Sequence, residues 1–269
     1  MPAELSYVES GVEHAPGGTL VLLHGFPLNA DMWEPVQKTP GALPGGWRLI
    51  APHFRGFGGS TGVPDTTPED QRSMDDYAAD VEALLDALHV HRAVIGGLSM
   101  GGYAAFALFR RAAARFRGMI LADTRPQPDS EDARAGRLRM IELAHREGPR
   151  AIADQMLPKL IGPQNRRLDL ENRLRSMAAA NTPDGLAGAL QRMMRRPDST
   201  PLLGTIACPT LVVVGSEDVL TPPQVAREMQ RQIPRARLEI IEAAGHVPNL
   251  EQPEAFNVAL SRFLASITR

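Results

Sequence analysis

The sequence is poor in cysteine. Cys208 is the only cysteine among 269 residues. A single thiol excludes an intrachain disulfide, and it also excludes a cluster of thiolate ligands around a metal ion. The histidines do not have the spacing of a metal site either. We therefore expect neither a metal nor a cofactor.

A strong net charge is also missing. The chain carries 29 Lys and Arg against 31 Asp and Glu, a formal net charge of -2, so nothing favours binding to nucleic acid or to an anionic membrane. No apolar run is long enough to span a bilayer. Residues 1–12 lack the basic segment and apolar core of a secretion signal. We expect a cytoplasmic protein.

Apolar runs alternate with segments of helical pattern along most of the chain. The continuous apolar runs at residues 19–23 and 210–214 are typical of strands buried on both faces. Residues 73–89 have an apolar helical face, and Ser73 and Asp76 form a capping-box pattern at its start. This alternation predicts an α/β fold with a mostly parallel central sheet flanked by helices. Further strands are expected at residues 4–9, 47–52, 93–95, 118–122 and 238–242, and further helices at 103–116, 225–232 and 253–267.

The alternation is interrupted once. Residues 125–201 contain no convincing strand and are broken by pairs such as Gly148-Pro149 and Thr182-Pro183. We interpret them as a helical cap inserted into a core made of residues 1–124 and 202–269. The cap is rich in methionine, whose flexible side chain suits either packing onto the core or an adaptable apolar pocket.

The pattern Gly-x-Ser-x-Gly occurs at residues 97–101. Gly97, Ser99 and Gly101 stand between the β-branched run at 93–95 and the helical run at 103–116. A strand, a sharp turn and a helix in this order form a nucleophile elbow, which exposes the serine Oγ. The same pattern also occurs by chance in plain loops. Because both flanks match, we interpret Ser99 as a nucleophile.

An acid and a base follow at the ends of later strands. Asp218 comes after the apolar run at 210–214, and His246 comes after the run at 238–242. Taken singly, Asp218 is compatible with a helix cap and His246 with a surface loop. The chain order Ser99, Asp218, His246 is that of a catalytic triad on a parallel α/β sheet. We interpret the three as catalytic.

Two other acidic residues are alternatives to Asp218. Asp123 also ends a strand, the one that follows the elbow helix, and Glu217 directly precedes Asp218. We favour Asp218 because it matches a Gly-x-x-Asp pattern with Gly215.

Acyl transfer also needs donors for an oxyanion. The first is the backbone N–H after the nucleophile, at Met100, and the second is expected at Phe26, in the loop after an early strand. We expect nearby His24 to stabilise its turn through a hydrogen bond and not to transfer protons.

Together these stretches resemble the α/β-hydrolase-fold serine hydrolases. The matching segments are residues 22–27, 55–60, 97–102, 214–218 and 245–246. The likeness extends to small carboxylesterases, enol-lactonases and carbon–carbon bond hydrolases. Serine at the nucleophile position sets the chain apart from haloalkane dehalogenases and epoxide hydrolases, which use aspartate there. One departure is His53, where relatives often carry aspartate.

The resemblance implies a hydrolase that needs no cofactor and acts on a small-molecule substrate. We expect cleavage of carboxylic esters with a small to medium acyl chain. Hydrolysis of a lactone or of a carbon–carbon bond by the same triad is the alternative, and a non-catalytic ligand receptor is a third reading. The motifs specify neither the physiological substrate nor an oligomeric state.

Overall fold

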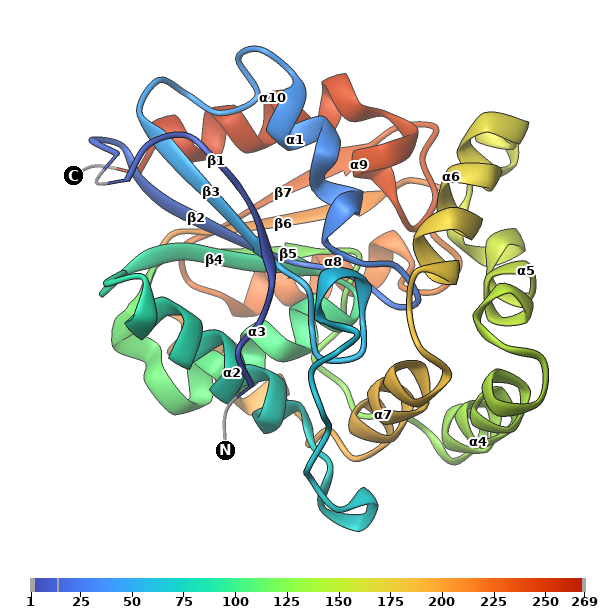
Figure 1. The fold of residues 1–269 in the computed structure, drawn as a ribbon. Coiled ribbons are helices and arrows are strands. Elements are labelled where there is room, and N and C mark those ends of the chain that lie inside the picture. The colour runs from blue at the N-terminus through green and yellow to red at the C-terminus, as the bar shows by residue number, and fades with distance from the viewer. Residues whose placement is uncertain (1–2, 14, 268–269) are drawn as a thin grey trace.

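The computed structural model describes residues 3–13 and 15–267, and its centre is a seven-stranded sheet. The strand order is β1-β3-β2-β4-β5-β6-β7. All neighbouring pairs from β3 to β7 run parallel, and β1 is an antiparallel edge strand paired with β3. The predicted α/β architecture is therefore confirmed (Figure 1). The strands are β1 (Tyr7–Ser10), β2 (Gly18–Leu23), β3 (Trp47–Pro52), β4 (Ala93–Leu98), β5 (Phe116–Ala122), β6 (Thr210–Gly215) and β7 (Ala236–Ile241).

Helices cover both faces of this sheet (Figure 1). Successive side chains of a strand point to opposite faces, so Val21 and Ile95 enter one core cluster while Leu20 and Val94 enter the other. The first cluster also takes apolar residues from α2 (Met74–Ala87), α3 (Met100–Ala112) and α8 (Pro223–Gln232). The second takes them from α1 (Glu34–Lys38), α9 (Pro248–Glu251) and α10 (Pro253–Ala265). Within the described chain no helix is both long and apolar enough to cross a membrane.

Four longer helices stand between β5 and β6 in the sequence. They are α4 (Glu131–Glu147), α5 (Pro149–Leu160), α6 (Leu168–Ala179) and α7 (Pro183–Met194). Proline at the first position of α5 and α7 fits a helix start, where its missing N–H has no intrahelical partner anyway. Figure 1 shows the four helices gathered to one side of the sheet, where α4 packs on α7 and α5 on α6.

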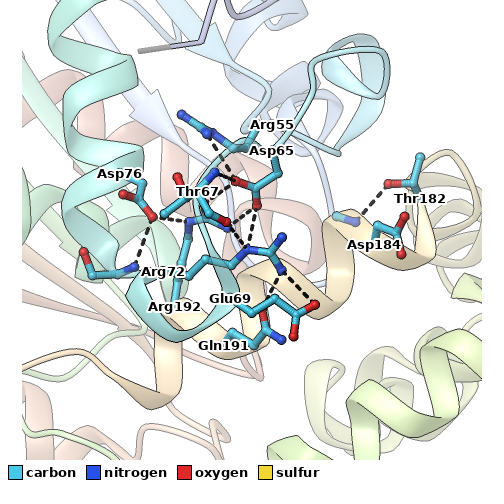
Figure 2. A network of polar contacts seen from close by, with 12 residues as sticks. Arg55, Asp65, Thr67, Glu69, Arg72, Asp76, Thr182, Asp184, Gln191 and Arg192 are labelled. Carbon is cyan, nitrogen blue, oxygen red and sulfur yellow. Dashed lines mark hydrogen bonds and ion pairs between the residues drawn. The ribbon is translucent and has the colours of Figure 1, made fainter. Parts of the chain in front are cut away.

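A buried ion-pair network joins α7 to the body of the molecule (Figure 2). The guanidinium of Arg192, which has no exposed surface, donates to both carboxylate oxygens of Asp65 at 2.8 and 2.9 Å. Its Nε lies 3.0 Å from Asp76 in α2. Next to it, Arg72 donates to Gln191 of α7 at 2.6 Å. Two-pronged arginine–carboxylate contacts fix orientation as well as distance, so the network holds α7 in one position against the core.

Candidate active site

The turn between β4 and α3 holds Ser99 in an unusual backbone conformation. Its φ of 54° and ψ of -111° lie outside the regions that non-glycine residues favour. The Ser99 N–H donates to the Ala122 carbonyl at 2.9 Å, and its carbonyl accepts from the Thr124 hydroxyl at 2.8 Å. Strain of this kind persists only where the surroundings hold the backbone in place, and here β5 and the residues after it do so.

The turn is tight enough to need glycine on both sides of the serine. A Cβ on Gly97 would lie 2.4 Å from the carbonyl carbon of Gly101, and a Cβ on Gly101 would lie 2.2 Å from the carbonyl oxygen of Leu23. Backbone atoms cannot yield to such contacts without moving β2 or β4. The two elbow glycines thus let α3 start directly against the sheet.

Asp218 and His246 meet at the ends of β6 and β7. His246 Nδ1 lies 2.8 Å from Asp218 Oδ2, and the two residues are 2% and 3% exposed. Asp218 also accepts hydrogen bonds from the Thr221 hydroxyl and from the backbone N–H groups of Leu220 and Thr221. Since an ionised carboxylate only accepts hydrogen bonds, Nδ1 carries the proton of this contact, and Nε2 is the ring nitrogen left for other partners.

The neighbouring carboxyls have opposite pKa shifts. Burial raises the pKa of Asp218, but the charge of His246 and the hydrogen bonds from His246 and Thr221 outweigh it, so the pKa lies well below its usual range. For Asp123, burial and then the negative charge of Asp218 raise the pKa well above the usual value. These surroundings favour the ionised form of Asp218 and the protonated form of Asp123.

Asp123 and Glu217, the alternative acids, have hydrogen-bond partners other than His246. Asp123 Oδ1 accepts from the Gly215 N–H at 2.9 Å, and Glu217 accepts from Gln164 at 2.8 Å. Among the described residues, Asp218 is the one carboxylate hydrogen-bonded to His246. Potential metal-ligand atoms of Asp123, Asp218 and His246 lie within 4.8 Å of one another. The Asp218–His246 hydrogen bond and the contact between the two carboxyls account for this proximity.

Ser99 and His246 line one cavity of about 310 Å³. Within the described residues, the structure has no hydrogen bond between their side chains, although both line the same cavity. Catalytic hydrogen bonds are commonly long in the absence of substrate and shorten when it binds. The cavity also touches Phe26 from the loop after β2 and three methionines of the inserted helices, Met140, Met156 and Met193.

Two backbone donors face this region. Met100 is the first residue of α3, where an N–H has no intrahelical acceptor, and Phe26 lies in the loop after β2. Neither N–H donates to another described residue. Together with the partial positive charge at the start of α3, the two N–H groups can donate hydrogen bonds to a negative oxygen next to Ser99.

Comparison with known proteins identifies the family of this chain. A family model described as the alpha/beta hydrolase fold matches residues 18–253. The chain belongs to the α/β-hydrolase family. Among curated proteins, this hydrolase is 30% identical over 268 residues to 3-oxoadipate enol-lactonase 1 of Acinetobacter baylyi, covering 98% of this chain and 94% of that enzyme.

Solved structures agree with this assignment. The hydrolase superposes on a thermophilic esterase from Thermogutta terrifontis, determined with malate bound, with a TM-score of 0.89 and 37% identity over 99% of this chain and 95% of that one. It superposes on the enol-lactonase from Burkholderia xenovorans with a TM-score of 0.87 and 27% identity, covering 98% and 97% of the two chains.

One buried carboxylate of the hydrolase escaped the sequence analysis. Glu251, 2% exposed, accepts from the N–H groups of Gly245 and Val247 on either side of His246 at 2.8 and 3.2 Å. It also accepts from the Gly162 N–H at 2.8 Å. Glu251 thus ties the His246 loop to the end of α5. No sequence motif marks Glu251, because its partners are mainly backbone N–H groups.

His24 stabilises its turn in the manner expected from the sequence. Its ring has no exposed surface, Nε2 accepts from the Phe54 N–H at 3.1 Å, and Nδ1 lies 3.2 Å from the Gly25 carbonyl. Burial, with a smaller contribution from His53, lowers the pKa of His24 to about 3. His53 itself accepts from the Ala30 N–H at 3.2 Å, so it has a structural contact of its own where relatives often carry aspartate.

Proposed function

We propose that this protein is a serine hydrolase that cleaves carboxylic esters of small to medium acyl chain through an acyl-enzyme. The observation that carries the proposal is the buried Asp218–His246 hydrogen bond beside the cavity that Ser99 lines. An acid–base pair next to a strained serine at a helix start is the arrangement that nucleophilic acyl transfer requires.

In the first half-reaction, Ser99 Oγ attacks the ester carbonyl carbon while its proton passes to His246 Nε2. Asp218 holds the ring in the required tautomer and stabilises the imidazolium. The bond between the acyl carbon and the leaving oxygen then breaks, and the proton on Nε2 goes to the departing alcohol. In the second half-reaction, water replaces the alcohol, His246 removes its proton, and Ser99 is released with the carboxylic acid.

The N–H groups of Phe26 and Met100 are proposed to bind the oxyanion of each tetrahedral intermediate. Both lack a described partner in the structure. A donor of this kind typically stabilises the transition state by roughly 3 kcal/mol.

We assign residues 125–201 the role of a cap that shapes the acyl pocket. Support comes from Met140, Met156 and Met193, which lie on three of the inserted helices and line the cavity. A cavity of about 310 Å³ suits a small molecule. Thioether side chains adapt to different apolar shapes, which fits a preference for short and medium acyl chains.

Lactone hydrolysis is the second candidate, favoured by the similarity to the enol-lactonases of Acinetobacter baylyi and Burkholderia xenovorans named above. The same triad opens a lactone when the leaving alcohol stays attached to the acyl group. A panel of p-nitrophenyl esters of increasing chain length, assayed beside simple lactones, separates the two candidates by their kcat/KM values. Carbon–carbon bond hydrolysis and ligand binding without catalysis remain weaker alternatives on the same site.

The proposal predicts that Ser99→Ala abolishes turnover of p-nitrophenyl butyrate. Loss of a nucleophilic serine lowers kcat by about 10⁴-fold or more, while the small alanine leaves the fold intact. Initial rates of release of p-nitrophenol measure the first effect, and circular dichroism with thermal unfolding checks the second. Unchanged turnover by the folded variant would overturn the assignment of Ser99.

A further inference from the structure

The lining of the cavity is strongly basic. Besides Ser99 and His246, the lining residues include Arg125, Arg137, Arg139 and Lys159. All lining residues belong to the described part of the chain, and none of them is Asp or Glu. For a protein with a formal net charge of -2, four cations around one small cavity are a local excess that an apolar ester would not need.

Only one of these cations is neutralised by the protein. Arg137 is ion-paired with Asp129, which also binds Arg196. The side chains of Arg125, Arg139 and Lys159 make no hydrogen bond or ion pair with any residue that the structure describes. The three unpaired cations leave a concentration of positive charge around the cavity that an anion from solution can balance.

Arg125 is the innermost of the three. It follows β5 by three residues, close in sequence to Asp123, and its Nε is buried without a hydrogen-bond partner. A buried guanidinium N–H without an acceptor costs free energy, which a ligand oxygen in the cavity would recover. Arg139 on α4 and Lys159 on α5 are exposed and lie farther out.

We propose that the substrate is an ester or lactone that carries a carboxylate, and that Arg125 binds this carboxylate. The planar guanidinium fork matches a carboxylate in shape and charge. Arg139 and Lys159 attract the anion toward the cavity mouth, as clustered like charges do around a cleft. This inference rests on the proposed ester or lactone hydrolysis and narrows its substrate class.

The test compares a charged substrate with an uncharged one of the same skeleton. Monomethyl adipate and dimethyl adipate probe a carboxylate on the acyl side, and 4-acetoxybutanoate with its methyl ester probes the alcohol side. The wild-type protein is expected to show the higher kcat/KM for the anionic member of at least one pair. Added salt is expected to raise KM for that anionic substrate, since exposed charges are screened.

Arg125→Gln is expected to lower kcat/KM for the anionic substrate by about 10- to 100-fold and to change that for p-nitrophenyl butyrate by less than about threefold. Arg125→Lys keeps the positive charge but loses the planar guanidinium. Its kcat/KM for the anionic substrate is expected to lie between those of the wild type and Arg125→Gln. The matched control is Arg134→Gln, because Arg134 is an exposed arginine of the same helix as Arg139 that does not line the cavity.

The outcomes separate the two proposals. If wild type prefers the uncharged member of both pairs, or if Arg125→Gln slows charged and uncharged substrates equally, the carboxylate assignment is wrong while the hydrolase assignment stands. If neither ester class is cleaved and Ser99 is unreactive, the proposed function itself fails. Retention of the anionic preference in both Arg125 variants would also overturn the inference.

Discussion

Asp123 and Asp218, the two buried carboxyls near His246, differ in their hydrogen-bond partners and in the direction of their pKa shifts. Asp218 hydrogen-bonds the ring and has a lowered pKa, whereas Asp123 bonds the Gly215 N–H and has a raised one. In its protonated form, Asp123 can donate a hydrogen bond to the nearby Asp218. The anionic partner that the proposed mechanism needs is therefore Asp218.

Asp218→Asn is accordingly expected to lower kcat far more than Asp123→Asn. An amide at 218 favours the wrong histidine tautomer and removes the charge that stabilises the imidazolium, an effect of about 10³- to 10⁴-fold. An amide at 123 keeps both an acceptor for Gly215 and a donor for Asp218, so we expect a loss below about tenfold. Steady-state rates with p-nitrophenyl butyrate measure both, and the reverse ranking would make Asp123 the orienting acid.

For single residues, the sequence predicted their place at the end of a strand better than it predicted which side chains they contact. Asp123 and Asp218 both end strands, and only the fold shows which carboxylate lies against His246. Glu251 could not be inferred, because its partners are backbone N–H groups, one of them at Gly162, 89 residues away. No sequence pattern indicated a role for Arg125 either, since an unpaired arginine is recognised only when its neighbours in the structure are known.

At the scale of elements, α7 is the segment whose position depends most clearly on buried charge. Arg192 connects it to Asp65 and Asp76, and its guanidinium lies 4.8 Å from the centre of the Tyr77 ring. Figure 2 shows Arg192 of α7, Asp76 of α2 and Asp65 of the loop between β3 and α2 converging on one another. A buried ion pair contributes little in itself, but removing one member leaves the others uncompensated.

Arg192→Met is expected to lower the free energy of unfolding by about 3 kcal/mol. Asp76 loses its ion pair with Arg192, and Asp65 loses its two-pronged contact and keeps only Arg55 and Arg72. Urea denaturation followed by circular dichroism measures the change. Arg195→Met is the matched control, since Arg195 is exposed and its side chain makes no hydrogen bond or ion pair with a described residue. Equal stability of the two variants would show that the network does not anchor α7.

Elements with local signals were predicted well. The capping box of Ser73 and Asp76 is present at the start of α2, and the elbow turn lies between a strand and a helix as its pattern required. The order of the strands in the sheet could not be predicted from the sequence, because β1 pairs antiparallel with β3 across more than 30 intervening residues. Pairing over such distances depends on the whole sheet and leaves no local pattern. The Arg192–Asp65 contact, 127 residues apart, is of the same kind.

At the scale of the whole molecule, a neutral buried histidine makes stability depend on pH. Between pH about 6.5, its ordinary pKa, and about 3, His24 takes up a proton in the unfolded chain but not in the native protein. The unfolded state then binds more protons, so stability rises with pH across this window and is lost as the pH falls. Above pH 6.5 the full contribution is present.

We predict that wild type loses up to about 1.4 kcal/mol of stability per pH unit from this group within the window. His24→Gln, which keeps an acceptor but cannot take up a proton, should lack this part of the slope. Urea unfolding at several pH values between 3 and 7 measures it as the difference between the two proteins, which removes the common contribution of the carboxyls. Parallel curves would contradict a neutral His24.

The central claim concerns Ser99, and its most direct test is covalent labelling. A fluorophosphonate probe reacts with a serine that is activated by a base and is followed by oxyanion donors. The account predicts one adduct, located by peptide mass spectrometry at Ser99, absent in Ser99→Ala and formed much more slowly in Asp218→Asn. Labelling at another residue, or full esterase activity without any adduct at Ser99, would contradict it.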